Sequence, residues 1–257
     1  MSATSQQRAR SAAARRGHRL PRVVPMWLRR RIEVDNTALL DFVGRVAASL
    51  PAGARVLDAG AGEGRYRPEL EHTRYVGIDL AVGDVGWHYQ DLDAMGDLSR
   101  LPFATGLFDA VLCTQVLEHV TDPQGVMGEI QRVLKPGGRL FLTAPQSWHQ
   151  HQKPHDYYRY TSFGLRHLLG QAGLDAQSLE PMGGYFWYLS FQLQNINYWL
   201  FPRGSRGRRW TWPIRALFGV VFQLLLPLLL YYLDRFDHQK DETFGYLCIA
   251  TKPSDGP

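Results

Sequence analysis

The chain has 257 residues, of which 45% are hydrophobic and 12% aromatic, and it is long enough to bury a sizeable core in one large domain. Its only two cysteines, Cys113 and Cys248, lie in apolar runs, which excludes a disulfide-stapled scaffold and favours a reducing, cytosolic setting. The net charge of +5 is uneven, because residues 1–32 carry nine arginines and no acid and leave the remainder at −4.

The N-terminal segment is a basic arm. Residues 2–22 are rich in Ala, Arg, Ser and Gln and lack the apolar run of a secretory signal. Such a composition cannot bury enough apolar surface to fold, so we expect a disordered, solvated arm over residues 1–32. An Arg-rich and Ser-rich segment without acids is also typical of an organelle transit peptide, and this alternative stays open. A functional arm would bind anionic lipid headgroups or nucleic acid phosphates.

A helix and a buried strand open the globular part. Asp35 or Asn36 can cap a helix whose apolar side chains fall on one face, and Pro51 ends it. Residues 55–59 follow as a short apolar run, which predicts a buried strand.

Glycines at alternate positions follow this strand, at Gly60, Gly62 and Gly64. Because they carry no side chains, they allow a sharp turn against which a ligand can lie. A dinucleotide fingerprint needs its third glycine three residues after the second, where this chain has Arg65. The turn alone leaves a dinucleotide, an adenosyl compound and no ligand as alternatives.

The second strand, predicted at residues 74–79, ends in an acid. Asp79 lies about twenty residues beyond the glycine turn, where a carboxylate accepts hydrogen bonds from both ribose hydroxyls of an adenosine ligand. A helix-capping role for Asp79 is the alternative. Residues 81–96 show no helical stripe, so we expect the helix between the second and third strands to be reduced or absent.

Two further strands are predicted from apolar runs at residues 108–114 and 139–145. Thr114 and Gln115 emerge at the carboxyl end of the first of these runs, the edge at which open parallel sheets bind ligands. A helix that closes on a Pro-Gly-Gly turn at residues 136–138 leads into the second.

The order of four motifs resembles the type 11 branch of the class I (Rossmann-like) S-adenosylmethionine-dependent methyltransferases. The motifs are Leu57-Asp58-Ala59-Gly60-Ala61-Gly62-Glu63-Gly64, Asp97 four residues before Leu101-Pro102-Phe103, Val116-Leu117-Glu118-His119-Val120, and Lys135-Pro136-Gly137-Gly138. Together they cover residues 53–145.

The resemblance implies an α/β fold with a doubly wound, seven-stranded sheet whose last strand is antiparallel, and S-adenosyl-L-methionine as the cofactor. In related proteins an acid at the position of Asp97 accepts from the adenine amino group, with Asp91 as the alternative here, while Leu101 and Phe103 would cover apolar surface near the ring. The expected cofactor-binding residues are Asp58, Gly60, Ala61, Gly62, Gly64, Asp79, Asp97, Leu101, Thr114 and Gln115.

A polar, aromatic loop at residues 146–161 leaves the fifth strand at the edge where an acceptor would meet the methyl group. Its stretch Pro154-His155-Asp156-Tyr157-Tyr158-Arg159-Tyr160-Thr161 resembles one found in type 11 members linked with cell-surface polysaccharide or lipid-linked sugar pathways. A histidine is the usual base for a hydroxyl acceptor, so the candidate catalytic residues are His155 first, then His119, Asp156 and Tyr158.

Two alternatives for this loop stay open. His155, Asp156 and Arg159 can instead form a hydrogen-bonded cap on the following helix. His149 and His151, with His155 and Asp156, are residue types found in metal sites, but their spacing fits no zinc pattern, and the resemblance implies no metal. We therefore expect none.

The chain ends with a helix over residues 161–172, a sixth strand near residues 174–179 and a final strand over residues 242–252. The family places only a short connection between the last two strands. The predicted organisation is thus the arm at 1–32, a methyltransferase domain at 33–182 and 242–257, and a helical, apolar insertion at 183–241.

The insertion has the composition of a membrane-binding element. Two apolar segments, residues 185–201 and 216–233, flank a turn with four arginines, and the second segment is of borderline length for a bilayer span. Both ends return to one sheet, so crossings must come in even numbers, and the first segment is too polar to be a second span. We expect helices in the interface of an anionic membrane and a cytoplasmic protein peripheral to its inner face. A protein-buried lid or a homodimer contact is the alternative.

These observations predict a methyltransferase that O-methylates a lipid-linked sugar or another amphiphilic acceptor at a membrane surface. A methyltransferase for a small soluble metabolite, with the insertion as lid or dimer contact, and an inactive cofactor-binding membrane adaptor are the alternatives. A nucleic-acid methyltransferase is favoured only by the basic arm, and the chain has no Asn-Pro-Pro-Tyr-type motif.

Overall fold

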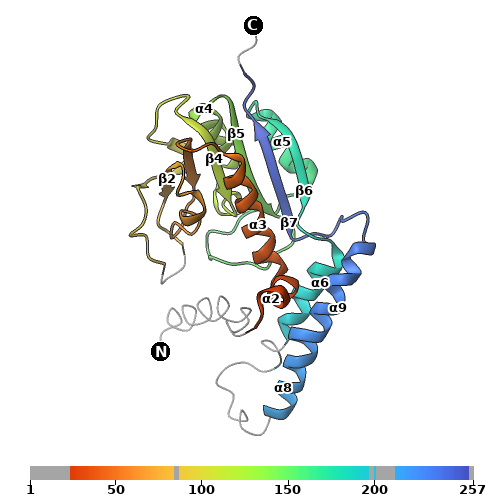
Figure 1. Ribbon diagram of the computed structural model, residues 1–257. Coiled ribbons are helices and arrows are strands. Elements are labelled where there is room, and N and C mark those ends of the chain that lie inside the picture. Colours follow the sequence, from red (N-terminus) through yellow and green to blue (C-terminus); the bar gives the residue numbers. More distant parts are fainter. Residues whose placement is uncertain (1–23, 84–86, 197–199, 201–211, 255–257) are drawn as a thin grey trace. The chain divides into compact units, whose positions relative to one another are not determined.

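The computed structural model describes residues 24–83, 87–196, 200 and 212–254 (Figure 1). The chain separates into two compact units. Residues 40–180 and 245–257 belong to the first, the sheet unit, and residues 1–39 and 181–244 belong to the second, the helical unit.

A seven-stranded sheet in the order β3-β2-β1-β4-β5-β7-β6 forms the centre of the sheet unit. The strands are β1 (Arg55–Ala59), β2 (Arg74–Asp79), β3 (Ala94–Met95), β4 (Phe108–Thr114), β5 (Leu134–Pro145), β6 (Asp175–Pro181) and β7 (Gly245–Thr251). Parallel pairing joins β3, β2, β1, β4 and β5, and β7 runs antiparallel to β5. The predicted fold class is confirmed, including the insertion between the last two strands.

Helices cover both faces of this sheet: α3 (Val34–Ser49), α4 (Pro123–Val133) and α5 (Ser162–Gln171). Alternate strand residues such as Leu57 and Val111 are fully buried in one core with α4 and α5, because successive side chains of a strand point to opposite faces. On the other face, Phe42 of α3 meets Phe141 edge to face, with ring centroids 6.5 Å apart. Figure 1 shows α3 in front of the sheet and α4 and α5 behind it.

Local signals set the element boundaries. The predicted strands at 55–59, 74–79 and 108–114 match β1, β2 and β4. The side chain of Thr161 accepts from the amide of Gly164 at the start of α5. Short 3₁₀ turns replace several helices: η1 (Pro68–Leu70), η2 (Leu98–Arg100) and η3 (Leu117–His119). Residues 80–83 and 87–93 carry no helix, as expected for the segment before β3.

The helical unit contains α2 (Met26–Ile32), α6 (Tyr185–Gln194), α8 (Trp212–Val220), the π-helical turn η4 (Val221–Leu225), α9 (Leu226–Leu233) and the 3₁₀ turn η5 (Asp234–Phe236). The buried carboxylate of Asp234 accepts from the amides of Gly184 and Trp187 at the start of α6. Trp187 also stacks on Tyr231 of α9, with centroids 5.4 Å apart, so α6 and α9 pack together.

The inner boundary predicted for the basic arm is wrong. Residues 26–32 belong to α2, whose last residue, Ile32, is 2% exposed. The guanidinium of Arg31 lies 5.8 Å from the ring centroids of both Tyr231 and Tyr232, so cation–π contacts with α9 hold this end of the arm. The prediction of disorder for residues 1–23 lies outside the described residues.

One helical run of the described chain, Trp212–Phe236, is long and apolar enough to cross a membrane. It has 25 residues, and its most apolar stretch has a mean hydropathy of 2.1. Only 11% of that stretch is buried.

Candidate active site

The turn after β1 is built from three glycines in the left-handed backbone region. The φ angles of Gly60, Gly62 and Gly64 are 85°, 57° and 69°, which L side chains rarely adopt. A side chain at Gly60 would also overlap Val116. The turn therefore presents bare backbone at the carboxyl edge of the sheet, where a ligand can approach closely.

Asp79 lies beside this turn at the end of β2. Its carboxylate accepts from the amide of Gly62 at 3.0 Å and from the amide of Ala81 at 2.7 Å. The amide of Ala61 donates to the carbonyl of Ile78 at 3.0 Å, which ties the turn to β2. Asp79 thus stands where the sequence predicts an adenosine ligand, and its contact with ribose stays a prediction.

Asp58 is fully buried at the end of β1. The hydroxyl of Tyr75 donates to its carboxylate at 2.7 Å. Burial raises the pKa of Asp58 to about 7; the Tyr75 hydrogen bond opposes this rise and the nearby Asp79 carboxylate adds to it. This geometry gives Asp58 a role in shaping the turn from within the sheet.

The residues predicted to surround adenine do not all lie beside the glycine turn. Asp97 is exposed, and its side chain accepts from the amide of Ser99 at 2.9 Å as the cap of η2. Leu101 is 5% exposed and belongs to the core. The alternative acid, Asp91, lies against the glycine turn, because a Cβ added to Gly64 would be 3.5 Å from the Cβ of Asp91. The structure thus brings Asp91 closer to the turn than the sequence prediction assumes.

The end of β4 adjoins the glycine turn. Thr114 is buried, and Gln115 adopts a left-handed φ of 53° that turns the chain out of the strand. The Gln115 amide donates to the Thr143 carbonyl at 3.0 Å and its side-chain amide to the Thr143 hydroxyl at 3.2 Å. Val116 follows and packs on Gly60.

One ion pair closes the loop after β5. The guanidinium of Arg159 donates to both carboxylate oxygens of Asp156, at 2.7 and 2.9 Å, and to the carbonyls of Trp148 and His149. Burial alone would raise the pKa of Asp156, but hydrogen bonds from Arg159 and from the His151 amide outweigh it and lower the pKa. Asp156, a predicted catalytic residue, therefore holds the loop in place.

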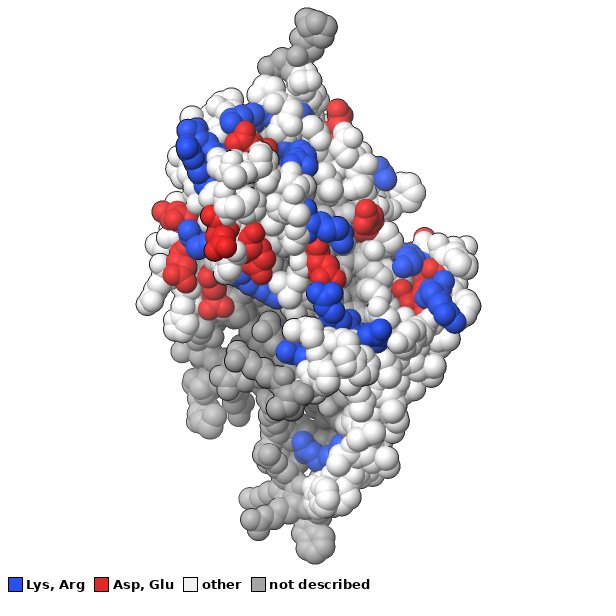
Figure 2. All heavy atoms as spheres, viewed as in Figure 1, with Lys and Arg blue, Asp and Glu red and all other residues white. Residues whose placement is uncertain are grey.

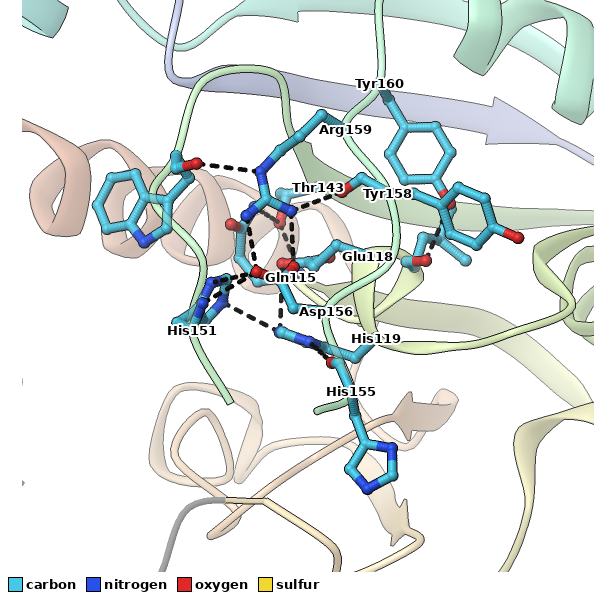
Figure 3. A network of polar contacts seen from close by, with 12 residues as sticks. Gln115, Glu118, His119, Thr143, His151, His155, Asp156, Tyr158, Arg159 and Tyr160 are labelled. Atoms are coloured by element: carbon cyan, nitrogen blue, oxygen red, sulfur yellow. Dashed lines mark hydrogen bonds and ion pairs between the residues drawn. The ribbon is translucent and has the colours of Figure 1, made fainter. Parts of the chain in front are cut away.

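Three polar side chains converge where this loop meets η3, as Figure 3 shows. Nε2 of His119 lies 3.0 Å from Nε2 of His151 and 3.7 Å from Oε1 of Glu118. Glu118 and His119 belong to η3 and His151 to the loop. We call these three residues the Glu-His-His cluster.

The cluster is mostly secluded from solvent. Glu118 is 0% exposed, and its carboxylate oxygens accept no hydrogen bond from another described residue. Burial raises the pKa of Glu118 to about 8. Burial first, and then the neighbouring His119, lower the pKa of His151 to about 4. These shifts favour the uncharged forms of the Glu118 carboxyl group and the His151 ring.

The structure places the second candidate base, His119, in the cluster and leaves the ring of the first, His155, outside it. The ring of His155 is exposed and points away from the cluster in Figure 3, with its Nδ1 3.2 Å from the Tyr157 hydroxyl. Its backbone carbonyl, however, accepts from Nδ1 of His119 at 2.5 Å. The hydroxyl of Tyr158 donates to the carbonyl of Thr121 at 3.1 Å. His119 thus lies in the cluster, while His155 and Tyr158 hold its surroundings.

Three residues of the site are absent from the predicted catalytic and cofactor-binding residues: Trp87, Glu118 and His151. Trp87 covers the glycine turn, since a Cβ at Gly62 would lie 3.1 Å from its ring. The acid before His119 and the His-x-His spacing of His149 and His151 were available as signals. Neither signal indicates that His151 of the loop lies beside Glu118 and His119 of η3. The cluster therefore becomes visible only in the folded structure.

Comparison with known proteins supports the same region. The family model described as Methyltransferase domain (type 11) matches residues 57–142. The ubiquinone biosynthesis O-methyltransferase of Xanthomonas oryzae pv. oryzae (strain PXO99A) is 38% identical over 126 residues, 42% of this chain and 49% of that protein. The enzyme of the same name from Chromobacterium violaceum is 30% identical over 179 residues, 58% of this chain and 75% of that protein.

The match spans about half the length of the Xanthomonas relative. Among solved structures, the Burkholderia thailandensis 1,6-didemethyltoxoflavin-N1-methyltransferase with bound 1,6-didemethyltoxoflavin and S-adenosylhomocysteine has a TM-score of 0.53 at 17% identity. The likeness covers 98% of this chain and 89% of that chain. At this identity the likeness shows the fold alone.

Proposed function

The chain belongs to the class I S-adenosylmethionine-dependent methyltransferases, and from this premise we propose that it transfers a methyl group to a hydroxyl oxygen of an amphiphilic acceptor at a membrane surface. The two relatives named as O-methyltransferases support an oxygen acceptor. One observation carries the proposal: the short connection from Val116 to His119 has one end against the glycine turn and the other in the Glu-His-His cluster.

The residues at the glycine turn fit the cofactor. When bound, S-adenosylmethionine supplies an electrophilic methyl group on a sulfonium sulfur. The turn carries no side chains at Gly60 and Gly62, and Val116 and Trp87 pack against these two glycines. A carboxylate has about four acceptor positions, so Asp79, which accepts two amides, retains capacity for ribose hydroxyls.

The cluster suits an acceptor that must lose a proton. As the acceptor oxygen forms its bond to the methyl carbon, the C–S electron pair returns to sulfur and the hydroxyl proton has to leave. The unshared pair on Nε2 of His119 faces the cluster and can receive it. Holding the reactants in line supplies on the order of 7–11 kcal/mol of the barrier reduction.

The amphiphilic part of the proposal rests on an exposed apolar stripe. Eight large apolar side chains of the run Trp212–Phe236 are 47–66% exposed: Trp212, Ile214, Leu217, Val220, Leu225, Leu229, Tyr232 and Phe236. Figure 2 shows that α8 and α9 present few charged side chains on the visible face. An exposed apolar surface of this extent is typical of a membrane or protein contact.

A π-helical turn within the run Trp212–Phe236 keeps the exposed apolar stripe on one face of the helix. From Ile214 onward its members are three or four residues apart, the spacing of one helical face, except for the five residues between Val220 and Leu225. The π-helical turn η4, Val221–Leu225, accommodates that extra residue. The run has basic residues near both ends, Arg215 and Arg235, and an anionic surface contributes about 1 kcal/mol for each nearby Arg.

The sheet topology favours a peripheral rather than a crossing arrangement. The insertion leaves from β6 and returns into β7, and these strands are neighbours in the sheet. A single crossing would place the two strands on opposite sides of a bilayer. We therefore propose that the stripe lies in the membrane interface on the cytoplasmic side, where the chain meets a lipid-linked acceptor.

Charged substitutions in the stripe should prevent vesicle binding. We expect the full chain to float with phosphatidylglycerol–phosphatidylcholine vesicles, and the triple variant Leu217→Asp, Leu225→Asp, Leu229→Asp to lose at least about tenfold in partitioning. Burial of each Leu contributes about 1.5–3 kcal/mol. Flotation through a sucrose gradient measures the partitioning.

Phe163→Asp is the matched control, since Phe163 is 82% exposed but lies on α5 in the sheet unit. This variant should float like the wild type. Equal recovery of the triple variant and the wild type would rule out the membrane role. A triple variant that instead converts from dimer to monomer by analytical sedimentation would assign the stripe to a contact between copies.

A further inference from the structure

We propose that the Glu-His-His cluster binds a divalent transition-metal ion of the Zn²⁺ class, with Glu118, His119 and His151 as ligands and an open coordination position for the acceptor oxygen. The potential ligand atoms all lie within 4.8 Å of one another. The consequence for catalysis rests on the proposed function, whereas the binding of the ion does not.

The hydrogen bonds of the two rings direct their lone pairs inward. Nδ1 of His119 lies 2.5 Å from the carbonyl of His155, and Nδ1 of His151 lies 3.2 Å from the carbonyl of His149. A carbonyl can only accept, so each Nδ1 carries the proton in the neutral ring. Each Nε2 then has an unshared pair, yet the two Nε2 atoms face each other at 3.0 Å. Two such pairs repel unless a cation lies between them.

Glu118 supplies the third potential metal ligand of the cluster. Its side chain is fully buried, and neither carboxylate oxygen accepts a hydrogen bond from another described residue. A buried carboxylate without partners is costly, and such a group is ordinarily paired or bound to a metal. Oε1 of Glu118 lies 3.7 Å from Nε2 of His119, so the carboxylate faces the same point as the imidazoles.

Two of the three ligand spacings are close to those around a tetrahedral ion. Ligand atoms about 2.0–2.2 Å from such an ion lie about 3.4 Å from each other, and the observed 3.0 and 3.7 Å fall on either side of this value. Two histidines and one carboxylate are the ligand set of an open, catalytic zinc site.

The surroundings of His151 also match a metal site. Nδ1 of His151 lies 3.6 Å from Oδ2 of Asp156, and the amide of His151 donates to the same oxygen at 2.9 Å. A carboxylate behind a ligating histidine is the usual outer partner that orients the ring. Arg159 fixes Asp156 in turn through both carboxylate oxygens.

An ion at this position would change how the acceptor is activated. A hydroxyl bound at the open position loses its proton more readily, and the proton passes to solvent instead of to an imidazole. The oxygen then attacks the methyl carbon, and the C–S electron pair returns to sulfur as before. The site would therefore favour acceptors with an acidic hydroxyl, such as a phenol.

Metal content of the full chain tests the inference. After chelator treatment, the chain is dialysed against Zn²⁺ alone, and we expect one bound ion per chain. His151→Ala and Glu118→Gln should each weaken Zn²⁺ binding by at least about tenfold, as loss even of an outer partner does. His167→Ala, on the exposed surface of α5, is the control and should bind Zn²⁺ like the wild type. With Co²⁺ as probe, His151→Ala should also alter the ligand-field absorption spectrum.

Each outcome decides one claim. Retention of no ion by the wild type, or equal retention by His151→Ala and Glu118→Gln, would overturn the metal site. Glu118→Gln keeps the volume of the side chain, so it remains informative if His151→Ala unfolds in thermal denaturation. Methyl transfer without any bound ion would exclude a catalytic role for the metal and leave the proposed function intact. If the chain binds one ion but methylates no hydroxyl, the metal site would stand and the proposed function would fail.

Discussion

Replacing His119 with Ala should lower the rate of methyl transfer by about 10²–10⁴-fold, the range expected for loss of a group that handles the acceptor proton. Nε2 of His119 lies in the Glu-His-His cluster, 3.0 Å from His151 and 3.7 Å from Glu118, so its removal opens the centre of the cluster. Single-turnover rates at saturating S-adenosylmethionine measure the effect. Cofactor affinity by calorimetry should not change, since the His119 ring contacts His151 and the carbonyl of His155 in the loop after β5.

His155→Ala is the matched control for this prediction. The His155 ring points away from the cluster, and the carbonyl that accepts from His119 remains in the alanine variant (Figure 3). We expect a loss at least tenfold smaller than that of His119→Ala. A larger loss for His155→Ala would restore the order of bases predicted from the sequence and would contradict the role given to the cluster.

Gly60→Ala should weaken S-adenosylmethionine binding by about tenfold to a hundredfold. The φ of Gly60 is 85°, and an added Cβ would overlap Val116, so the turn has to move away from its ligand-binding shape. A strained non-glycine residue costs about 1–3 kcal/mol, which sets this range. Isothermal titration with the cofactor and with its demethylated product measures the loss.

Gly53→Ala is the control that introduces backbone strain at a left-handed glycine without a steric overlap like that between Gly60→Ala and Val116. Gly53 has a similar φ of 77°, but a Cβ added there meets nothing within 4 Å, and the residue precedes β1. This variant should lose stability and keep cofactor affinity. Unchanged affinity in Gly60→Ala would show that the cofactor does not use this turn.

Much of the sheet unit can be predicted because its signals are local. Short apolar runs mark β1 and β4, since strands buried on both faces need apolar residues at successive positions, and a terminal acid marks the end of β2. Gly60 and Asp79 are recognisable for the same reason, as a backbone requirement and an acid at a strand end. These features need no knowledge of distant contacts.

The Glu-His-His cluster depends on contacts between distant segments and therefore cannot be predicted in this way. His151 reaches His119 because Arg159 folds the loop back on itself through Asp156. The sequence prediction places His155 before His119, because His155 lies in the loop expected to meet the acceptor.

The helical unit shows the same limit. The apolar run is visible in the sequence, but the π-helical turn at Val221–Leu225, which keeps the exposed stripe on one side, has no clear sequence signal. The basic arm predicted over residues 1–32 includes helix α2, because the arm is defined by its arginine-rich, acid-free composition. Arg31 instead lies over the rings of Tyr231 and Tyr232 in α9, a contact between residues far apart in the chain.

The most direct test of the proposed function follows the methyl group itself. The full chain is incubated with methyl-labelled S-adenosylmethionine and a detergent-solubilised membrane lipid extract, and the products are partitioned between organic and aqueous phases. We predict label in the organic phase as a methyl ether on an acceptor oxygen, and its loss in the Gly60→Ala variant. Label confined to a water-soluble product, or attached to nitrogen, would contradict O-methylation of an amphiphilic acceptor.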